Sequence, residues 1–530
     1  MVSEAGGRAT PGRLSFALGL PLAWRAALLP SALAGLVLLT RLPFRTRYLL
    51  NWDADQFALG IDHFDVIHHQ PHPPGYLVYV ALGRLLEPPL GNANAALVTI
   101  SIAGECAGVV IAYLFARELF GAWAGLVAGL ALALSPLFWY YGEAANTYAL
   151  EPALALGVAW AAWRCWNGRA AAALPAGITL ALAGAFRPST AVLLSPLVLA
   201  ALWKLGSRRA LLAAGSGSGL LTAAWVVPLL VLAGGPGRYL QAALQLGGSV
   251  TTGTAVWRAG LAGLDTTSGA VLLGLVWDLG AFAVIALFGL GVAPRLGRVL
   301  DLPAGWARFC LVWTAPALLT FLLVHIGQVV YVQLFTPALF LMAGPAALAA
   351  CRVLGRPRLA GSIVGVALAV NCLTFLLPLH YSLASQLSLH DQVVAQTVAL
   401  VSAEDPASTV LITDVYAIGS YRTAQVYLPA YHRVALARDL KGRPGEIFGD
   451  VYEPGRLDRA SPLAFPVVAR TFLFLDSQVV DGLVADPERL TSAKLADGTR
   501  IYIWKGPAPV LRHGQVWLGP DYRDTQGRNI

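Results

Sequence analysis

Residues 93 to 116 read ANAALVTISIAGECAGVVIAYLFA, and this stretch decides the class of fold. A helix needs roughly 20 predominantly apolar residues to cross the hydrocarbon core of a bilayer. The stretch has that length, and Glu105 is its only charged side chain. Because backbone groups inside lipid must be satisfied within the segment itself, the stretch is predicted to be a transmembrane helix.

Similar apolar runs recur on both sides of this segment. They lie near residues 26–41, 121–138, 148–163, 171–186, 188–203, 210–233, 269–292, 309–325, 331–350 and 359–379. The whole chain is 57% hydrophobic and only 12% charged, whereas soluble domains carry about 25% charged residues. This composition excludes a soluble globular protein. It predicts a mainly α fold, a polytopic transmembrane bundle of about eleven spans in the cell membrane.

Basic residues set the expected orientation of the bundle. The formal net charge is +8, but most basic residues outside the tail lie in short connections between apolar runs. They indicate topology and predict no nucleic-acid partner. The pattern places the N-terminus in the cytoplasm and residues 42–92 and the C-terminus outside it. Arg41, Arg45 and Arg47 are exceptions, because they follow the first span on the outer side.

The composition becomes that of a soluble domain from about residue 385. Short β-rich runs appear at 409–413, 434–436, 471–475 and 500–504. This alternation is typical of strands. We therefore expect two domains, a transmembrane domain over residues 1–384 and a small extracytoplasmic α/β domain over residues 385–530.

The first outer loop, residues 42–92, is the segment richest in ionisable side chains. These are Asp53, Asp55, Asp62, Asp65, His63, His68, His69 and His72. Phe57, Ile61 and Phe64 recur at helical spacing, which predicts an amphipathic helix in the membrane interface with its acids toward water. The alternative is a solvated loop whose charges only keep it in water, and for Asp62 and His63 that interpretation is favoured.

The histidines of this loop raise the question of a metal. His68, His69, His72 and Asp65 include the ligand types that zinc prefers. Their spacing, however, matches no defined metal site. We therefore expect no cofactor and keep a divalent metal as the alternative.

Three motifs resemble those of the glycosyltransferase C superfamily. They are HPPGY at His72–Tyr76, FWYYGEAANTYALE at Phe138–Glu151 and HIGQVVYVQLFTPALFL at His325–Leu341. The likeness extends over most of residues 45 to 350. It is greatest to protein O-mannosyltransferase-like bacterial membrane proteins and more distant to the lipid A aminoarabinose transferase.

The resemblance implies transfer of a sugar from a polyprenyl-phosphate donor to a protein, lipid or glycan acceptor. Asp53 matches the catalytic acid of the family, and Trp52 before it suits the headgroup level of a membrane. The usual Asp-Glu pair of the family is here Asp53-Ala54-Asp55, so either aspartate is a candidate base. One base suffices for an inverting transfer, because the phosphate leaves as an anion and needs no acid.

Further side chains are candidates for substrate binding. They are His72, Glu143, Tyr148, Arg187, Arg258, His325, Gln328 and Tyr331. Glu143 would cost about 2.5 kcal/mol or more within reach of hydrocarbon, which favours a role for it. The Arg187 guanidinium can hold a phosphate with two parallel hydrogen bonds, and the alternative is an arginine that snorkels from a helix end.

Two other functions compete with sugar transfer. A transporter or flippase would show internal repeats and ionisable groups near the bilayer midplane, whereas no clear repeat is visible and the acids cluster at the outer edge. A receptor that binds a ligand with its tail would leave the acidic first loop without a role.

Overall fold

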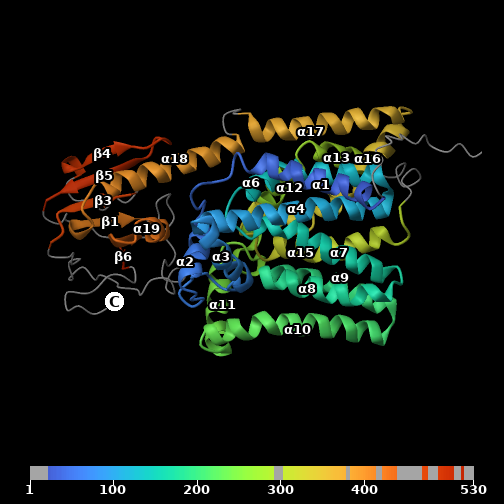
Figure 1. The fold of residues 1–530 in the computed structure, drawn as a ribbon, viewed down its shortest axis with the longest axis horizontal. Helices are drawn as coiled ribbons and strands as arrows, with labels where there is room; N and C mark the ends of the chain where they lie inside the picture. Colours follow the sequence, from blue (N-terminus) through green and yellow to red (C-terminus); the bar gives the residue numbers. More distant parts are fainter. Residues whose placement is uncertain are drawn as a thin grey trace, which may run out of the picture.

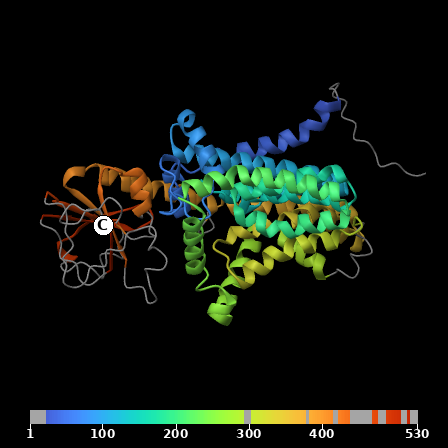
Figure 2. The same cartoon turned by 90° about the horizontal axis from the view of Figure 1, so that it is seen from below.

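The computed structural model describes residues 22–291, 302–377, 382–413, 421–437, 468–475, 487–506 and 515–518. A bundle of helices forms one end of the molecule and a small sheet forms the other (Figure 1). The long helix α18 (Leu383–Ser402) runs from the bundle to the sheet. Figure 2, turned by 90°, shows the same division.

Most of the described helices belong to the bundle. They are α1 (Leu22–Arg41), α2 (Trp52–Asp62), α3 (Leu77–Leu90), α4 (Ala93–Phe120), α5 (Ala122–Ala133), α6 (Pro136–Gly142), α7 (Glu151–Trp166), α8 (Ala173–Phe186), α9 (Pro188–Leu205), α10 (Arg208–Leu232), α11 (Pro236–Val250), α12 (Val256–Leu279), α13 (Phe282–Gly291), α15 (Trp306–Leu323), α16 (Pro337–Val353) and α17 (Ala360–Leu376). Six of the described helices are long and apolar enough to cross a membrane, or seven if the bent pair α5 and α6 forms one span. The count of about eleven spans stays a prediction.

Two predicted spans have the wrong boundaries. The run 121–138 is broken into α5 and α6, which meet at an angle of 59°. Ser135 caps α6 by accepting from the Phe138 amide at 3.2 Å, and Pro136 has no amide hydrogen with which to continue α5. The run 269–292 is divided at Gly280 between α12 and α13. Asn371 holds that break by accepting from the Ala281 amide at 2.7 Å.

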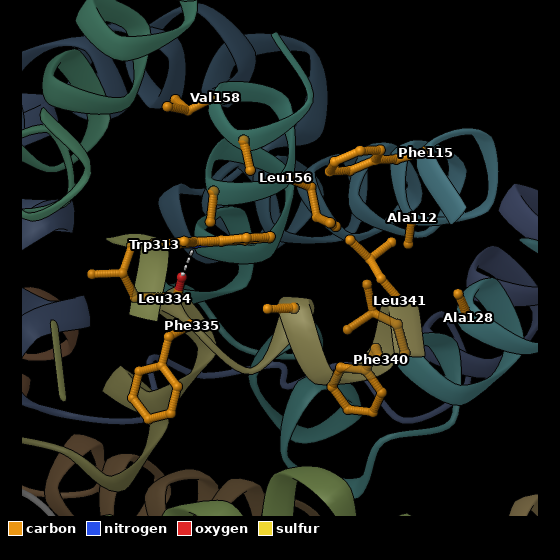
Figure 3. Packing of buried hydrophobic residues seen from close by; sticks show 14 of the residues in the cluster. Ala112, Phe115, Ala128, Leu156, Val158, Trp313, Leu334, Phe335, Phe340 and Leu341 are labelled. Atoms are coloured by element: carbon orange, nitrogen blue, oxygen red, sulfur yellow. Dashed lines mark hydrogen bonds between the residues drawn. The ribbon is translucent and has the colours of Figure 1, made fainter. Parts of the chain in front are cut away.

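The core of the bundle is formed by side chains from helices far apart in the sequence. Figure 3 shows Phe115 of α4, Leu156 of α7 and Leu341 of α16 in one cluster, all of them fully buried. Trp313 of α15 lies in the same cluster and donates its indole hydrogen to the Leu334 carbonyl at 3.2 Å. This contact holds the segment after α15 against the bundle.

Arg41, an exception to the predicted charge pattern, is buried inside the bundle. Its Nε atom lies 2.5 Å from the Glu105 carboxylate, and both side chains are 0% exposed. The Trp139 ring also contacts the guanidinium, with 5.1 Å between Cζ and the ring centroid. Arg41 therefore neutralises an acid of α4 and is not an outer-loop charge.

Arg41→Met is expected to lower the free energy of unfolding by about 3 to 5 kcal/mol, because Glu105 would remain as a buried charge without its partner. Adding Glu105→Gln should recover much of this loss, since the acid paired with Arg41 then carries no charge. Thermal unfolding of the purified protein in detergent measures both effects. The exposed Arg45→Met is the matched control, and an equal loss there would contradict the explanation.

The sheet has six described strands in the order β4-β5-β3-β1-β2-β6. They are β1 (Thr409–Thr413), β2 (His432–Ala437), β3 (Thr471–Phe474), β4 (Thr491–Lys494), β5 (Arg500–Lys505) and β6 (Gln515–Leu518). The central strand β1 pairs in parallel with β2 and β3, and the outer pairs are antiparallel. The four predicted strands coincide with β1, β2, β3 and β5, whereas β4 and β6 were not predicted.

The first outer loop lies between the bundle and the C-terminal part of the chain (Figure 1). The middle of α18 binds it, since Asp391 accepts from the Arg47 and Tyr48 amides at 2.8 and 3.1 Å. Tyr427 of α19 (Tyr421–Tyr427) also binds the loop, because its hydroxyl oxygen accepts from the Leu49 amide at 2.8 Å. The predicted helix of this loop is present as α2, but it is packed on two sides. The expectation that its acids face water was wrong for Asp55, which is buried, while the placement of the helix in the membrane interface stays a prediction.

Candidate active site

Asp53 lies in the first turn of α2 and remains accessible, with 27% of its side chain exposed. The preceding Asn51 starts the helix, because its side chain accepts from the Ala54 amide at 3.0 Å. Tyr148 donates its hydroxyl to Asp53 Oδ2 at 3.0 Å. One carboxylate oxygen is thereby oriented by the tyrosine, and the other is left to accept from elsewhere.

His72 lies beside Asp53 and is oriented by Gln56. Its Nδ1 atom is 2.7 Å from Gln56 Oε1 and 3.9 Å from Asp53 Oδ1. Gln56 Oε1 also accepts from the His72 amide at 2.8 Å. Since an amide oxygen only accepts, the tautomer consistent with this contact has its proton on Nδ1. Burial lowers the pKa of His72 against the opposing charge of Asp53, so the ring is neutral at pH 7.

The turn that follows His72 brings an aromatic wall to the site. Gly75 has φ 101° and Tyr76 has φ 44°, a left-handed conformation that costs energy for a tyrosine. The Tyr76 ring packs against the rings of His72 and Phe57, at 5.1 and 5.0 Å between centroids. The HPPGY segment thus contributes two packed rings, His72 and Tyr76, beside Asp53.

Arg187 is buried between two aromatic rings, with 5% of its surface exposed. Its Cζ atom lies 4.5 Å from the Tyr148 centroid and 4.3 Å from that of Tyr331. Its Nε atom is 3.6 Å from Glu151, while Nη1 is buried with no hydrogen-bond partner among the described residues. The alternative of a snorkelling arginine was wrong, because this guanidinium lies inside the protein.

Asp55, the second candidate base, points to the opposite side of α2. It is 1% exposed and accepts from the Thr423 hydroxyl of α19 at 2.7 Å. Burial raises its pKa to about 8, against the opposing effects of the Thr423 hydrogen bond and the charge of Arg422. The geometry therefore separates the two aspartates, with Asp53 in the accessible site and Asp55 at the contact with the C-terminal part.

The raised pKa of Asp55 predicts a pH dependence of stability. An unfolded aspartate has a pKa near 3.8, so between about pH 4 and pH 8 the folded state binds more protons than the unfolded state. Stability contributed by this group therefore falls as the pH rises through that window. Asp55→Asn should remove this fall, and the melting temperature of the variant relative to wild type should be higher at pH 8.5 than at pH 5.5. Asp62→Asn, which changes an exposed aspartate, serves as the control. If the difference in melting temperature between Asp55→Asn and wild type were the same at pH 5.5 and pH 8.5, the prediction would be contradicted.

The other predicted binding residues lie in different surroundings. Glu143 is enclosed in the bundle, where it accepts from the Trp139 indole at 2.7 Å and lies near Arg41. Arg258 is exposed and donates to the Gly248 carbonyl at the end of α11 at 2.5 Å. His325 contacts the Thr254 hydroxyl at 3.1 Å. The structure does not bring these three side chains to Asp53.

Gln328 and Tyr331 lie closer to the site. Gln328 lines a cavity together with Asn51 and Tyr141. Tyr331, in the short helix η3 (Val329–Leu334), packs on Tyr148 at 5.6 Å between ring centroids. The motif at His325–Leu341 thus supplies Tyr331, one of the two rings that enclose Arg187. It also supplies Gln328, which lines the cavity.

The histidines of the first loop have different partners. His68 pairs with Asp65 at 2.5 Å, and His69 is buried, with burial lowering its pKa to about 3. His72 turns toward Gln56. Among the residues that the structure describes, no group of three or more His, Cys, Asp or Glu side chains could hold a metal ion.

Sequence reasoning missed two partners in this site. Gln56 orients His72, and its position one helical turn after Asp53 was a usable signal. Glu151 was not among the predicted site residues, yet it pairs with Arg187 and accepts from the Thr190 hydroxyl at 2.8 Å. Glu151 lies near the start of the predicted span 148–163, and Arg187 follows the end of the next predicted span, 171–186. Opposite charges at these two positions could have suggested the pair.

Comparison with known proteins supports the resemblance. The chain is similar to ArnT from Cupriavidus metallidurans in the apo state, with TM-score 0.57 and 13% identity over 91% of this chain and 98% of that one. It is similar to ArnT bound to undecaprenyl phosphate, with TM-score 0.53, 13% identity and the same coverage. For the apo oligosaccharyltransferase of Archaeoglobus fulgidus the TM-score is 0.50, with 14% identity over 93% and 76% of the two chains. A search of curated proteins found no match.

These similarities confirm the predicted resemblance, and the chain shares its fold with ArnT and with the archaeal oligosaccharyltransferase. The several long apolar helices among the described residues indicate a multi-pass membrane protein. More particularly, residues 71–232 match the model of the dolichyl-phosphate-mannose-protein mannosyltransferase family. The match includes His72, Tyr148 and Arg187, whereas Asp53 lies before it and Tyr331 after it.

Proposed function

We propose that this protein transfers a hexose or pentose from a polyprenyl-phosphate donor to a hydroxyl group of an extracytoplasmic acceptor, with inversion at the sugar carbon. The observation that carries the proposal is the position of Tyr148. Its hydroxyl binds the Asp53 carboxylate, and its ring packs on the Arg187 guanidinium. A proton acceptor and a cation therefore lie on two sides of one side chain.

In the proposed reaction Asp53 removes the proton from the acceptor hydroxyl as its oxygen attacks the anomeric carbon of the sugar. The bond between that carbon and the phosphate oxygen breaks, and the lipid phosphate leaves as an anion. Attack from the face opposite to the phosphate inverts the configuration. Such a base typically contributes about 10² to 10⁴ in rate.

Arg187 is proposed to hold the phosphate. Its Nη1 atom has no hydrogen-bond partner among the described residues, and a buried guanidinium donor without a partner is costly unless a ligand completes it. Glu151 neutralises only part of the guanidinium, through Nε at 3.6 Å. The structure of ArnT with undecaprenyl phosphate shows that a similar protein binds a lipid of this class.

The proposed topology follows from the same site. The loop that carries Asp53 lies at the end of the bundle that faces the sheet (Figure 1). The distribution of basic residues favours the outer side of the membrane for this end. Under the proposal the N-terminus is cytoplasmic, and the sheet and the reaction are extracytoplasmic.

The test supplies the purified protein with radiolabelled polyprenyl-phosphate sugars and with membrane extract as acceptor. Label is expected to move from the lipid fraction to an acceptor when one donor matches. A parallel assay in vesicles follows the movement of the labelled lipid between leaflets. Movement of the lipid without turnover of any donor would replace the proposal by a transporter or flippase.

A further inference from the structure

A cavity of about 360 Å³ lies where α2, α6 and α18 approach each other. Its lining includes Asn51 before α2, Tyr140 and Tyr141 of α6, Gln328 before η3, and Gln386 and His390 of α18. The volume is within the range of small-ligand sites in proteins. Since one wall comes from α18, the helix that runs to the sheet (Figure 1), the cavity exists only when both ends of the molecule are present.

The cavity is connected to the reaction site through Tyr141 and Asn51. The Tyr141 ring packs edge-on against Tyr148, with 5.5 Å between centroids, and Tyr148 donates to Asp53. Asn51, in the wall of the cavity, also caps the helix that carries Asp53. A molecule in the cavity therefore lies one side chain from the tyrosine that binds Asp53, and Arg187 is not part of the lining.

The polar groups that line the cavity are neutral hydrogen-bonding groups. Gln328 and Gln386 are exposed carboxamides with no hydrogen-bond partner among the described residues. His390 donates from Nε2 to the Leu49 carbonyl at 2.9 Å, which leaves Nδ1 as an acceptor. Burial lowers the pKa of this histidine. Among the described residues, no Lys, Arg, Asp or Glu belongs to the lining.

Such a lining matches one class of ligand. Carboxamides both donate and accept, as the hydroxyl groups of a sugar require, and the two tyrosines combine an apolar ring with a polar hydroxyl. A phosphorylated or carboxylated acceptor would be desolvated here without a cation to pair with, which is unfavourable. The chemistry of the wall therefore favours an uncharged, hydroxyl-rich molecule.

We infer that this cavity is the acceptor subsite and that the acceptor is a neutral carbohydrate, bound between α6 and α18. The inference rests on the proposed sugar transfer and names its acceptor class. It also gives α18 a part in binding, because Gln386 supplies both a donor and an acceptor to the sugar.

The test measures binding of four probes to the full-length protein in detergent by isothermal titration. The probes are mannotriose and cellotriose as neutral carbohydrates, trigalacturonate as an anionic one, and a capped neutral tripeptide with a central threonine. At least one neutral trisaccharide is expected to bind. Gln386→Leu should weaken this binding about three- to tenfold, the effect of losing one or two neutral hydrogen bonds.

Gln392→Leu is the matched control, because Gln392 is an exposed glutamine of the same helix outside the cavity lining. Its affinity should stay within about twofold of wild type. Equal affinity in the Gln386 variant, binding of only the peptide or the anion, or binding of neither neutral trisaccharide would overturn the inference.

The two proposals can fail separately. If the trisaccharide binds and depends on Gln386 while no donor is ever turned over, sugar transfer fails and the carbohydrate site stands. If donors are turned over but neither neutral trisaccharide binds, the acceptor class fails and sugar transfer stands. Undecaprenyl phosphate binding should be equal in wild type and Gln386→Leu, since the lipid is proposed to lie on the Arg187 side.

Discussion

Asp53→Asn is expected to lower the rate of sugar transfer by about 10² to 10⁴, the usual contribution of a positioned base. The carboxamide keeps the size of the side chain and can still accept from Tyr148, but it cannot take a proton from the acceptor. Donor binding should be nearly unchanged, because the phosphate is proposed to lie at Arg187. The initial rate of transfer from a radiolabelled polyprenyl-phosphate sugar measures the loss, and a binding assay with the same lipid measures affinity.

Asp55→Asn is the matched control, because it changes the same side chain two residues away. The structure places this carboxyl against Thr423 and away from the accessible site. Transfer at pH 7 should stay within a few-fold of wild type. If Asp55→Asn abolished transfer in a folded protein and Asp53→Asn did not, the two roles would have to be exchanged.

Arg187→Met is expected to weaken binding of undecaprenyl phosphate by about 2 to 5 kcal/mol, the usual effect of removing one member of a buried charge pair. The phosphate loses the Nη1 donor, and the cation between Tyr148 and Tyr331 disappears. Arg187→Lys should recover only part of the affinity, because an ammonium lacks the planar fork of a guanidinium. Titration with the lipid measures both variants.

A loss of fold has to be separated from a loss of affinity in this experiment. Arg187→Met leaves Glu151 buried without its partner, so the double variant Arg187→Met/Glu151→Gln is the form to purify. Arg258 is an exposed arginine of α12. The Arg258→Met variant should bind the lipid as wild type does. Equal affinity for undecaprenyl phosphate in the folded double variant and in wild type would remove Arg187 from the phosphate site.

The sequence by itself determined the class of fold, because hydropathy is a local property. Long apolar runs must become helices in lipid wherever they lie in the chain, so most predicted spans coincide with described helices. The alternating runs near residues 409–413 and 471–475 coincide with strands β1 and β3 for a similar reason. The motifs around His72 and Tyr148 likewise pointed to the site region from residues close together in the sequence.

Only the tertiary structure decided which of these residues meet. Asp53 and Asp55 are equivalent in sequence, and the difference between them comes from Thr423, 368 residues away along the chain. From the sequence, Arg187 could equally have been an arginine that snorkels from a helix end. The structure encloses it between the rings of Tyr148 and Tyr331, which come from two distant segments. Arg41 was predicted to be a charge of the outer loop, whereas the structure pairs it with the buried Glu105. The burial of a side chain and its choice of partner depend on packing between distant segments. Such packing cannot be predicted from the local composition of the sequence.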